Sequence, residues 1–287
     1  MSIVTTQPLP AWQLRNSKFI WGQRTYLMGV LNVTPDSFSD GGQFDTLETA
    51  LTQARCLIAA GADILDIGGQ STRPQAEEIS LDEELHRVMP IVQAIRQDSD
   101  IPISIDTTRA TVASAAVAAG ADVINDVSGG RFDPDMLPTI AKLGVPVMLM
   151  HMRGTPKTMQ QLTDYQNLIG EITDFLQHQI DTAIACGVDP AQIAIDPGIG
   201  FAKTYAQNLE ILRRLAEFHT LNCPILVGVS RKSFIGHILN QPDPQQRVWG
   251  TAAACSAAIV GGADILRVHD VQAIHDVCRV MDAIWRH

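Results

Sequence analysis

The chain has 287 residues, of which 46% are hydrophobic and 18% are charged. A chain of this length and composition can bury a large apolar core, which excludes a disordered or low-complexity protein. The 21 basic residues minus the 31 acidic residues give a net charge of −10. Such a charge disfavours a nucleic acid or an anionic membrane surface as a partner, so any anionic ligand must be held by a few local groups.

The cysteines and the first residues indicate the compartment. The five cysteines are scattered and never form a CxxC pair, and the stretch MSIVTTQPLPAWQLR lacks the pattern of a secretory signal. The apolar run TAAACSAAIVGGA is too short to cross a bilayer, so we interpret it as a closely packed helix. We therefore expect a cytoplasmic protein without a membrane segment.

Residues 1–24 form the first predicted unit. In PAWQLRNSKFIWGQR, the polar residues Asn16, Ser17 and Lys18 separate two apolar runs, a pattern that favours a short β-hairpin. We expect this hairpin to plug the N-terminal mouth of a barrel that is formed by residues 25–287.

Eight short apolar strands are predicted from residue 26 onward. Three follow an Ala-rich helix that stops at glycine, which tolerates the left-handed position after a helix; these are AAGADILDIGG, AAGADVINDVSGG and VGGADILRVHDV. The other five are YLMGVLNV, IPISIDT, VPVMLMHM, IAIDPG and PILVGVSR.

Helical periodicity fills the intervals between the strands. It covers 45–60, 81–97, 109–119, 134–143, 160–186, 205–220, 244–261 and 272–285. Eight strand–helix repeats over about 250 residues predict an α/β fold, a single-domain (β/α)8 TIM barrel. An open doubly wound sheet is the rival, but in GIGFAK the residue Lys203 replaces the third glycine of the nucleotide fingerprint.

Polar residues stand where the strands end, which is the active face of such a barrel. Because residues two apart share a face of a strand, we expect Asp106 and Asp196 to point inward toward a ligand. For Asp66 and Asp126 we favour the capping of a following loop. His151 fits a structural role as well as a site role. The other strand-end residues are Asn32, Asn125, Ser230, Arg231, Lys232, Arg267 and His269.

Three loops at this face are predicted to be functional. NVTPDSFSDGGQF (32–44) and GGQSTRPQAEEIS (68–80) are long and polar, as binding loops or lids often are. GVSRKSFIG (228–236) superficially matches a nucleophile elbow, but Lys232 stands in place of its second glycine, which disfavours a serine hydrolase. We expect Ser233 to cap the next helix and to leave backbone N–H groups free for an anion.

Several of these strings together resemble the dihydropteroate synthase family. They are MGVLNVTPDSFSDGG (28–42), DIGGQSTRP (66–74), INDVSGG, LMHMRGTPKTM, IDPGIGF, VGVSRKS and LRVHDV, in that order. The resemblance implies a (β/α)8 barrel, usually a homodimer, that joins 6-hydroxymethyl-7,8-dihydropterin diphosphate to p-aminobenzoate and releases pyrophosphate with Mg²⁺ present. Gln70 stands where the family commonly has Glu, and Arg109 where it commonly has Lys.

The resemblance also implies site residues. For the pterin they are Asp106, Asn125, Met150, Asp196 and Lys232. For the diphosphate they are Asn32, Thr72, Arg267 and His269, with Asn32 as the Mg²⁺ ligand and Arg267 and His269 as the cationic donors. For p-aminobenzoate they are Phe38, Arg73, Pro74, Phe201 and Ser233. Catalysis is expected from Lys232, Asp106, Arg267 and His269 without a covalent nucleophile.

Three other functions remain open at this stage. A pterin-binding methyltransferase-type barrel would share the pterin residues but should lack the diphosphate pair Arg267 and His269. A Schiff-base aldolase would use Lys232 as its nucleophile. A non-catalytic paralogue would bind pterin without forming a product.

Overall fold

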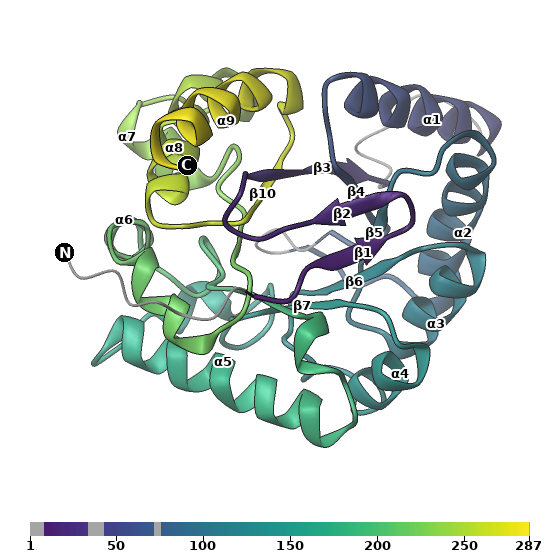
Figure 1. Ribbon diagram of the computed structural model, residues 1–287, viewed down its shortest axis with the longest axis horizontal. Helices are drawn as coiled ribbons and strands as arrows, with labels where there is room; N and C mark the ends of the chain where they lie inside the picture. Colours follow the sequence, from purple (N-terminus) through teal and green to yellow (C-terminus); the bar gives the residue numbers. More distant parts are fainter. Residues whose placement is uncertain (1–8, 34–42, 72–75, 287) are drawn as a thin grey trace.

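The computed structural model describes residues 9–33, 43–71 and 76–286. Within these ranges, eight parallel strands surround a common axis, with helices outside them (Figure 1). The strands are β3 (Tyr26–Asn32), β4 (Ile64–Gly68), β5 (Ile103–Asp106), β6 (Val123–Asp126), β7 (Val147–Met150), β8 (Ile193–Asp196), β9 (Leu226–Val227) and β10 (Ile265–Val268). A bridge between Ile195 and Ile225 joins the two outer strands of the sheet. The predicted (β/α)8 barrel is confirmed.

The helices lie close to their predicted positions. They are α1 (Gln43–Ala59), α2 (Leu81–Asp98), α3 (Ala110–Ala119), α4 (Met136–Leu143), α5 (Leu168–Ala185), α6 (Tyr205–Arg213), α7 (Ser233–Ile238), α8 (Val248–Val260) and α9 (Val271–Trp285). Helix α5 begins later than residue 160, because Asn167 caps it by accepting from the Gly170 N–H. After α6 the chain continues as a 3-10 helix over Leu215–Leu221. The six-residue α7 lies outside the ranges of helical periodicity, although a helix capped by Ser233 was expected here.

The repeated Gly-Ala-Asp has a structural function in the barrel. The glycines after α1, α3 and α8 are left-handed, with φ of 97° at Gly61, 114° at Gly120 and 88° at Gly262. The aspartate that follows each of them accepts an N–H at the start of the neighbouring strand. These bonds join Asp63 to Leu27, Asp122 to Ile103 and Asp264 to Ile225, at 2.8 to 3.0 Å.

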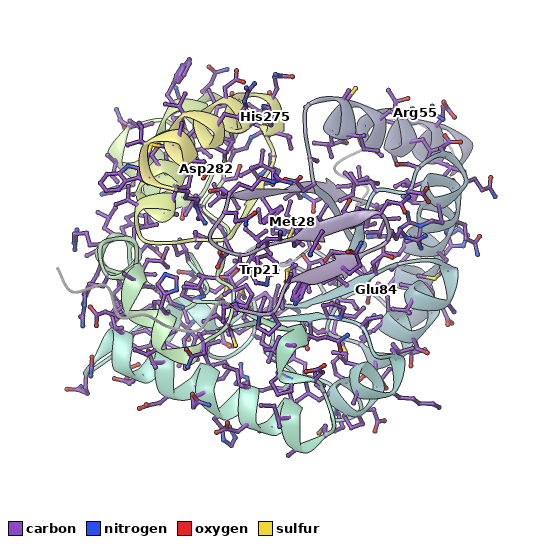
Figure 2. The ribbon with its side chains drawn as sticks, in the orientation of Figure 1. Trp21, Met28, Arg55, Glu84, His275 and Asp282 are labelled. Atoms are coloured by element: carbon purple, nitrogen blue, oxygen red, sulfur yellow. The ribbon has the colours of Figure 1, made fainter. Side chains whose placement is uncertain are left out.

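The predicted hairpin is present, as β1 (Trp12–Leu14) and β2 (Ser17–Phe19). Its tight turn lies at Arg15, with φ of 51°, and Asn16, slightly earlier than predicted. Trp12 and its neighbouring aromatics pack on the first inward residues of the strands, such as Tyr26 and Ile64. Figure 2 shows Trp21 and Met28 at the centre of the molecule. The hairpin therefore closes the N-terminal mouth, and any ligand must enter from the opposite end.

No helix within the described residues is long and apolar enough to cross a membrane.

Candidate active site

The floor of the open mouth is a buried ion-pair group that three strands bring together. Arg267 on β10 donates from Nε to Asp66 on β4 at 2.6 Å and from Nη2 to Asp106 on β5 at 2.9 Å. Asp66 also accepts from Ser104 Oγ at 2.7 Å and from Asn125 Nδ2 at 3.3 Å. The arrangement holds a guanidinium, two carboxylates and an amide in fixed positions at the base of the mouth.

Asp66 corrects one sequence-based interpretation. We expected it to cap a loop, but it is fully buried and points into the barrel. It shares its strand face with Ile64, which packs on the hairpin, so strand parity alone would have placed it correctly. Asp126, in contrast, is confirmed as a cap, because it accepts from the Ser128 and Gly130 N–H groups at 2.7 and 2.9 Å.

Burial controls the protonation of these groups. Desolvation raises the pKa of Asp106 to about 7, although the charge of Arg267 opposes the shift. Desolvation likewise raises the pKa of Asp196, against the Gly198 N–H and the charges of Lys232 and Lys203. It lowers the pKa of Lys232 to about 8. The mouth therefore contains groups whose charge a bound ligand can change near neutral pH.

A second group of residues, which we call the slot, lies at the ends of β7 and β8 and in the loops that follow β8 and β9. Asp196 at the end of β8 is 6% exposed and accepts the Gly198 N–H at 2.7 Å. Lys232 Nζ lies 4.3 Å from the centre of the Phe201 ring. Met150 on β7 belongs to a small apolar cluster against which Phe201 packs. The structure thus brings together all five residues that the resemblance assigns to the pterin.

His269 differs from its predicted role as a cation. Its Nδ1 lies 3.0 Å from Ser230 Oγ, and burial together with the nearby charge of Arg267 lowers its pKa to about 3. The imidazole is consequently neutral in the ligand-free protein. His269 is placed near Arg267, as strand parity predicted, but Arg267 alone carries the positive charge of this pair.

Ser233 also differs from its prediction. It is the first residue of α7 and is exposed, whereas Lys232 is the N-cap residue and no side chain caps this helix. Asn32 ends β3 at the mouth, as expected. Four residues predicted for the site, Phe38, Thr72, Arg73 and Pro74, lie outside the described residues.

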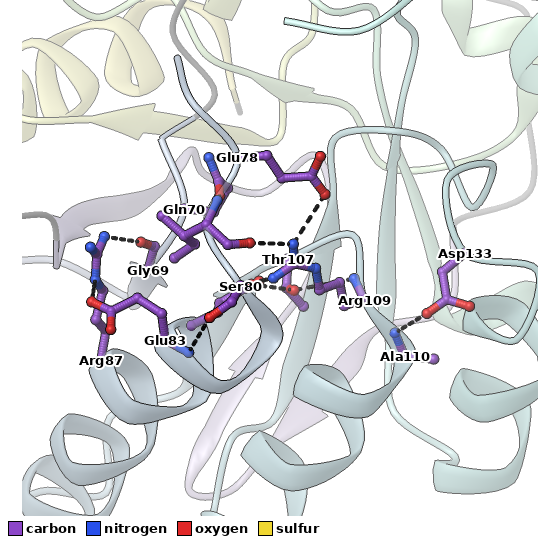
Figure 3. Close-up of polar contacts among 12 residues, drawn as sticks. Gly69, Gln70, Glu78, Ser80, Glu83, Arg87, Thr107, Arg109, Ala110 and Asp133 are labelled. Carbon is purple, nitrogen blue, oxygen red and sulfur yellow. Dashed lines mark hydrogen bonds and ion pairs between the residues drawn. The ribbon is translucent and has the colours of Figure 1, made fainter.

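The base of the second loop is tied by Gln70 (Figure 3). Its Nε2 donates to the carbonyls of Ser71 and Glu77, both at 2.9 Å, and its Oε1 accepts the Ile79 N–H at 2.8 Å. An amide can make both kinds of bond, whereas a carboxylate accepts only. The Gln70 side chain therefore joins the two ends of this loop.

A second hydrogen-bonded connection, which was not predicted from the sequence, lies beside Gln70. Glu84 of α2 is 2% exposed and accepts from Thr107 Oγ1 at 2.6 Å and from Arg109 Nη1 at 2.9 Å. Arg109 also donates to the Ile79 carbonyl at 2.6 Å (Figure 3). The positive charge at position 109 thus anchors the loop after β5 to the end of the second loop. These residues line one side of a cavity that reaches Asp106.

A buried lysine was also missed. Lys203 is 2% exposed, and its Nζ lies 2.9 Å from His151 Nδ1 and 2.9 Å from the Phe201 carbonyl oxygen. Burial and the charge of Lys203 lower the pKa of His151 to about 2. His151 is therefore a neutral hydrogen-bond acceptor behind the slot rather than part of its lining.

Comparison with known proteins identifies the family. The model of the family described as pterin binding enzyme matches residues 28–269. A dihydropteroate synthase of Synechocystis is 60% identical, with 97% of this chain and 96% of that protein covered. Two solved dihydropteroate synthases have a TM-score of 0.90 and cover 96% of this chain and 98% of theirs. One, from Yersinia pestis with a sulfonamide drug, is 44% identical, and the other, from Xanthomonas albilineans with 4-aminobenzoic acid, is 42% identical.

We predict that Asp106→Asn reduces the pH dependence of stability. Because the folded protein holds the Asp106 proton up to a pH of about 7, against 3.8 as the ordinary value, the free energy of unfolding falls as the pH rises through this window. Asn cannot titrate, so the variant should gain stability relative to the parent from pH 4 to 7, by about 4 kcal/mol at most. Urea unfolding at each pH measures the difference; a constant difference would contradict the prediction.

Proposed function

The chain belongs to the dihydropteroate synthases within the pterin-binding enzyme family, and from that premise we propose how its barrel mouth joins 6-hydroxymethyl-7,8-dihydropterin diphosphate to p-aminobenzoate. It is a transferase of folate biosynthesis that forms 7,8-dihydropteroate and pyrophosphate. The observation that carries the proposal is the slot over the Arg267 floor, where Asp106, Asn125 and Asp196 face Lys232. The comparisons favour this reaction over a methyltransferase or an aldolase.

The slot matches the edge of a dihydropterin. That edge presents a 2-amino group and ring N–H groups, which a carboxylate can accept in pairs. Asp196 takes this role, because its Oδ1 is already held by the Gly198 N–H and its side chain is fixed. Asn125 binds the same edge of the pterin beside Asp196. Lys232 donates to the ring carbonyl, and Met150 packs against the ring face.

The diphosphate is bound at the Arg267 side of the mouth. Arg267 Nη1 makes no hydrogen bond to the described residues, so it can donate to a phosphate oxygen while Nε and Nη2 stay on their carboxylates. His269 donates as a neutral imidazole. A diphosphate beside it would raise its pKa again, because a neighbouring negative charge favours the imidazolium.

Mg²⁺ fits this part of the site through Asn32. The Asn32 amide supplies an oxygen, the donor type that Mg²⁺ prefers. No group of three or more His, Cys, Asp or Glu side chains within the described residues could hold a metal. An ion carried mainly by substrate oxygens and water agrees with that donor set. When bound, it would stabilise the negative charge of the departing pyrophosphate.

The reaction needs no covalent nucleophile from the protein. Cleavage of the C–O bond releases pyrophosphate and leaves a cation that the pterin ring stabilises. The aniline nitrogen of p-aminobenzoate attacks this cation and then loses one proton to the released pyrophosphate or to solvent. Arg267 and His269 stabilise the leaving group, while Asp106 and Asp196 face the developing positive charge. The p-aminobenzoate is bound by Phe201 and Ser233, together with Phe38, Arg73 and Pro74 from the flanking loops. Exclusion of water protects the cation.

The direct test is product formation. Purified protein with the pterin diphosphate, Mg²⁺ and radiolabelled p-aminobenzoate should yield labelled dihydropteroate. Lys232→Ala, in which the donor to the ring carbonyl is lost, should reduce turnover at least 100-fold, on the order expected for a group that contacts the reacting molecule. A parent protein without product under saturating substrate would instead indicate the non-catalytic paralogue.

The role of Arg267 gives a second test. Arg267→Ala should weaken binding of the pterin diphosphate about 100-fold, whereas binding of the free pterin alcohol should change much less, because a charged hydrogen bond to the diphosphate is worth roughly 1.5–3 kcal/mol. Isothermal titration with each ligand separates the two effects. An equal loss of affinity for both ligands would contradict this role and indicate instead that the ion-pair group of Asp66, Asp106 and Arg267 is disrupted.

We also propose that the protein is a homodimer in the cytoplasm. All five cysteines are unpaired, which agrees with a reducing compartment. The outer faces of α8 and α9 expose large apolar side chains that a solvated helix would rarely carry; they are Trp249 (80%), Val260 (51%), Val280 (59%), Ile284 (54%) and Trp285 (57%). This surface suits a second copy of the chain.

Sedimentation tests the dimer. The parent should sediment at twice the chain mass of 31.2 kDa, and Val280→Glu should shift it to the mass of one chain, because a charge is costly inside an apolar interface. Ile184→Glu on α5 makes the same change at an exposed apolar residue on another helix and should leave the mass unchanged. A monomeric parent would contradict the proposal.

A further inference from the structure

We propose that Lys203 is a positioning residue for the p-aminobenzoate side of the site and that it acts through Phe201. The inference rests on the proposed function, because Phe201 is assigned there to p-aminobenzoate. Lys203 itself lies behind the slot, at 2% exposure, and its Nζ donates to the Phe201 carbonyl oxygen at 2.9 Å.

The burial of this lysine needs a physical reason. Burial lowers the pKa of Lys203 well below its ordinary value, because the ammonium loses its hydration. Within the described residues Lys203 forms no ion pair, and its hydrogen-bond partners are a carbonyl and a neutral imidazole. A methionine of similar shape would fill the space at lower cost. The amine is therefore explained by its two hydrogen bonds.

These bonds hold a strained segment. Between Asp196 and Lys203 the backbone is left-handed at Gly198, Gly200 and Ala202, with φ of 72°, 88° and 52°. For Ala202 this conformation is strained, since its Cβ crowds the following carbonyl oxygen. The bond from Lys203 to the Phe201 carbonyl spans Ala202 and stabilises the conformation that directs Phe201 into the mouth.

His151 supplies a fixed anchor for the amine. Its backbone N–H donates to the Asp196 carbonyl at 2.9 Å, so it is part of the β7–β8 ladder. Its ring packs edge-on against Phe175, with centroids 4.8 Å apart. In the neutral tautomer that carries its proton on Nε2, Nδ1 accepts from Lys203 Nζ at 2.9 Å. The second bond of Lys203 thus ends on a rigid part of the barrel.

The contacts of Phe201 and Asp196 predict a selective effect. The Phe201 ring lies under Lys232 Nζ, so a shift of the Phe201 backbone moves the ring that borders p-aminobenzoate. Asp196 ends β8, where the His151 backbone N–H holds its carbonyl in the β7–β8 ladder, a bond that does not involve the Lys203 side chain. Loss of the Lys203 bonds should therefore disturb p-aminobenzoate much more than the pterin.

Lys203→Met tests this inference, because Met has a similar length and cannot donate. The KM for p-aminobenzoate should rise about tenfold, as expected for one or two lost hydrogen bonds, while the Kd of the pterin diphosphate should change less than about twofold. In a Phe201→Ala background the same substitution should add little to the p-aminobenzoate KM, because coupled residues are not additive. An unchanged p-aminobenzoate KM, an equal loss for both substrates, or full additivity would overturn the role.

Two further variants control the experiment. Ala202→Gly relieves the left-handed strain but keeps both Lys203 bonds, so its kinetic constants should stay close to those of the parent. If Lys203→Met does not fold, His151→Phe serves as the alternative, because it removes only the anchoring imidazole. This variant should show the same selective rise in the p-aminobenzoate KM, but a smaller one. An unchanged p-aminobenzoate KM in His151→Phe would also overturn the role of Lys203. A parent that forms no dihydropteroate would contradict the proposed function instead, which keeps the two failures distinct.

Discussion

The guanidinium of Arg267 is the group on which the geometry of the mouth depends. It forms ion pairs with Asp66 and Asp106, two buried carboxylates whose charges would otherwise lie side by side without a counter-charge. Because these three residues come from β10, β4 and β5, the ion pairs also fix the relative positions of three strand ends. Asn125 donates to Asp66, so the amide that is proposed to bind the pterin edge is held by the same group.

Two ionisable groups in the mouth, Asp106 and Lys232, have pKa values near neutral pH, so a bound ligand can change their charge. Burial brings the pKa of Asp106 up to about 7 and that of Lys232 down to about 8, and it leaves His269 neutral. An anionic substrate that enters would stabilise the charged forms of Lys232 and His269, and the ring N–H groups of a pterin would stabilise ionised carboxylates. Binding thereby creates the electrostatic field that the departing pyrophosphate requires.

The sequence predicted the barrel, the hairpin plug and the strand-end residues, since the alternation of apolar strands with Gly-terminated helices depends on local pattern. The sequence-based interpretation did not place the Asp66 side chain inside the barrel. A lone aspartate at a strand end most often caps the following loop, and this common role was preferred to the inward direction that strand alternation indicates. The neutral state of His269 depends on burial, which no local pattern reports. Lys203 was treated only as a break in a glycine fingerprint, and its partner His151 lies 52 residues away.

The charges in the mouth also bear on the proposed ion. The buried acids Asp66, Asp106 and Asp196 are opposed by Arg267 and Lys232, whereas Lys203 forms no ion pair within the described residues and contacts a carbonyl and an imidazole. A diphosphate ester adds several negative charges to a pocket that has no net positive charge of its own. A divalent cation bound with the substrate would supply positive charge, and this need is consistent with the proposed Mg²⁺.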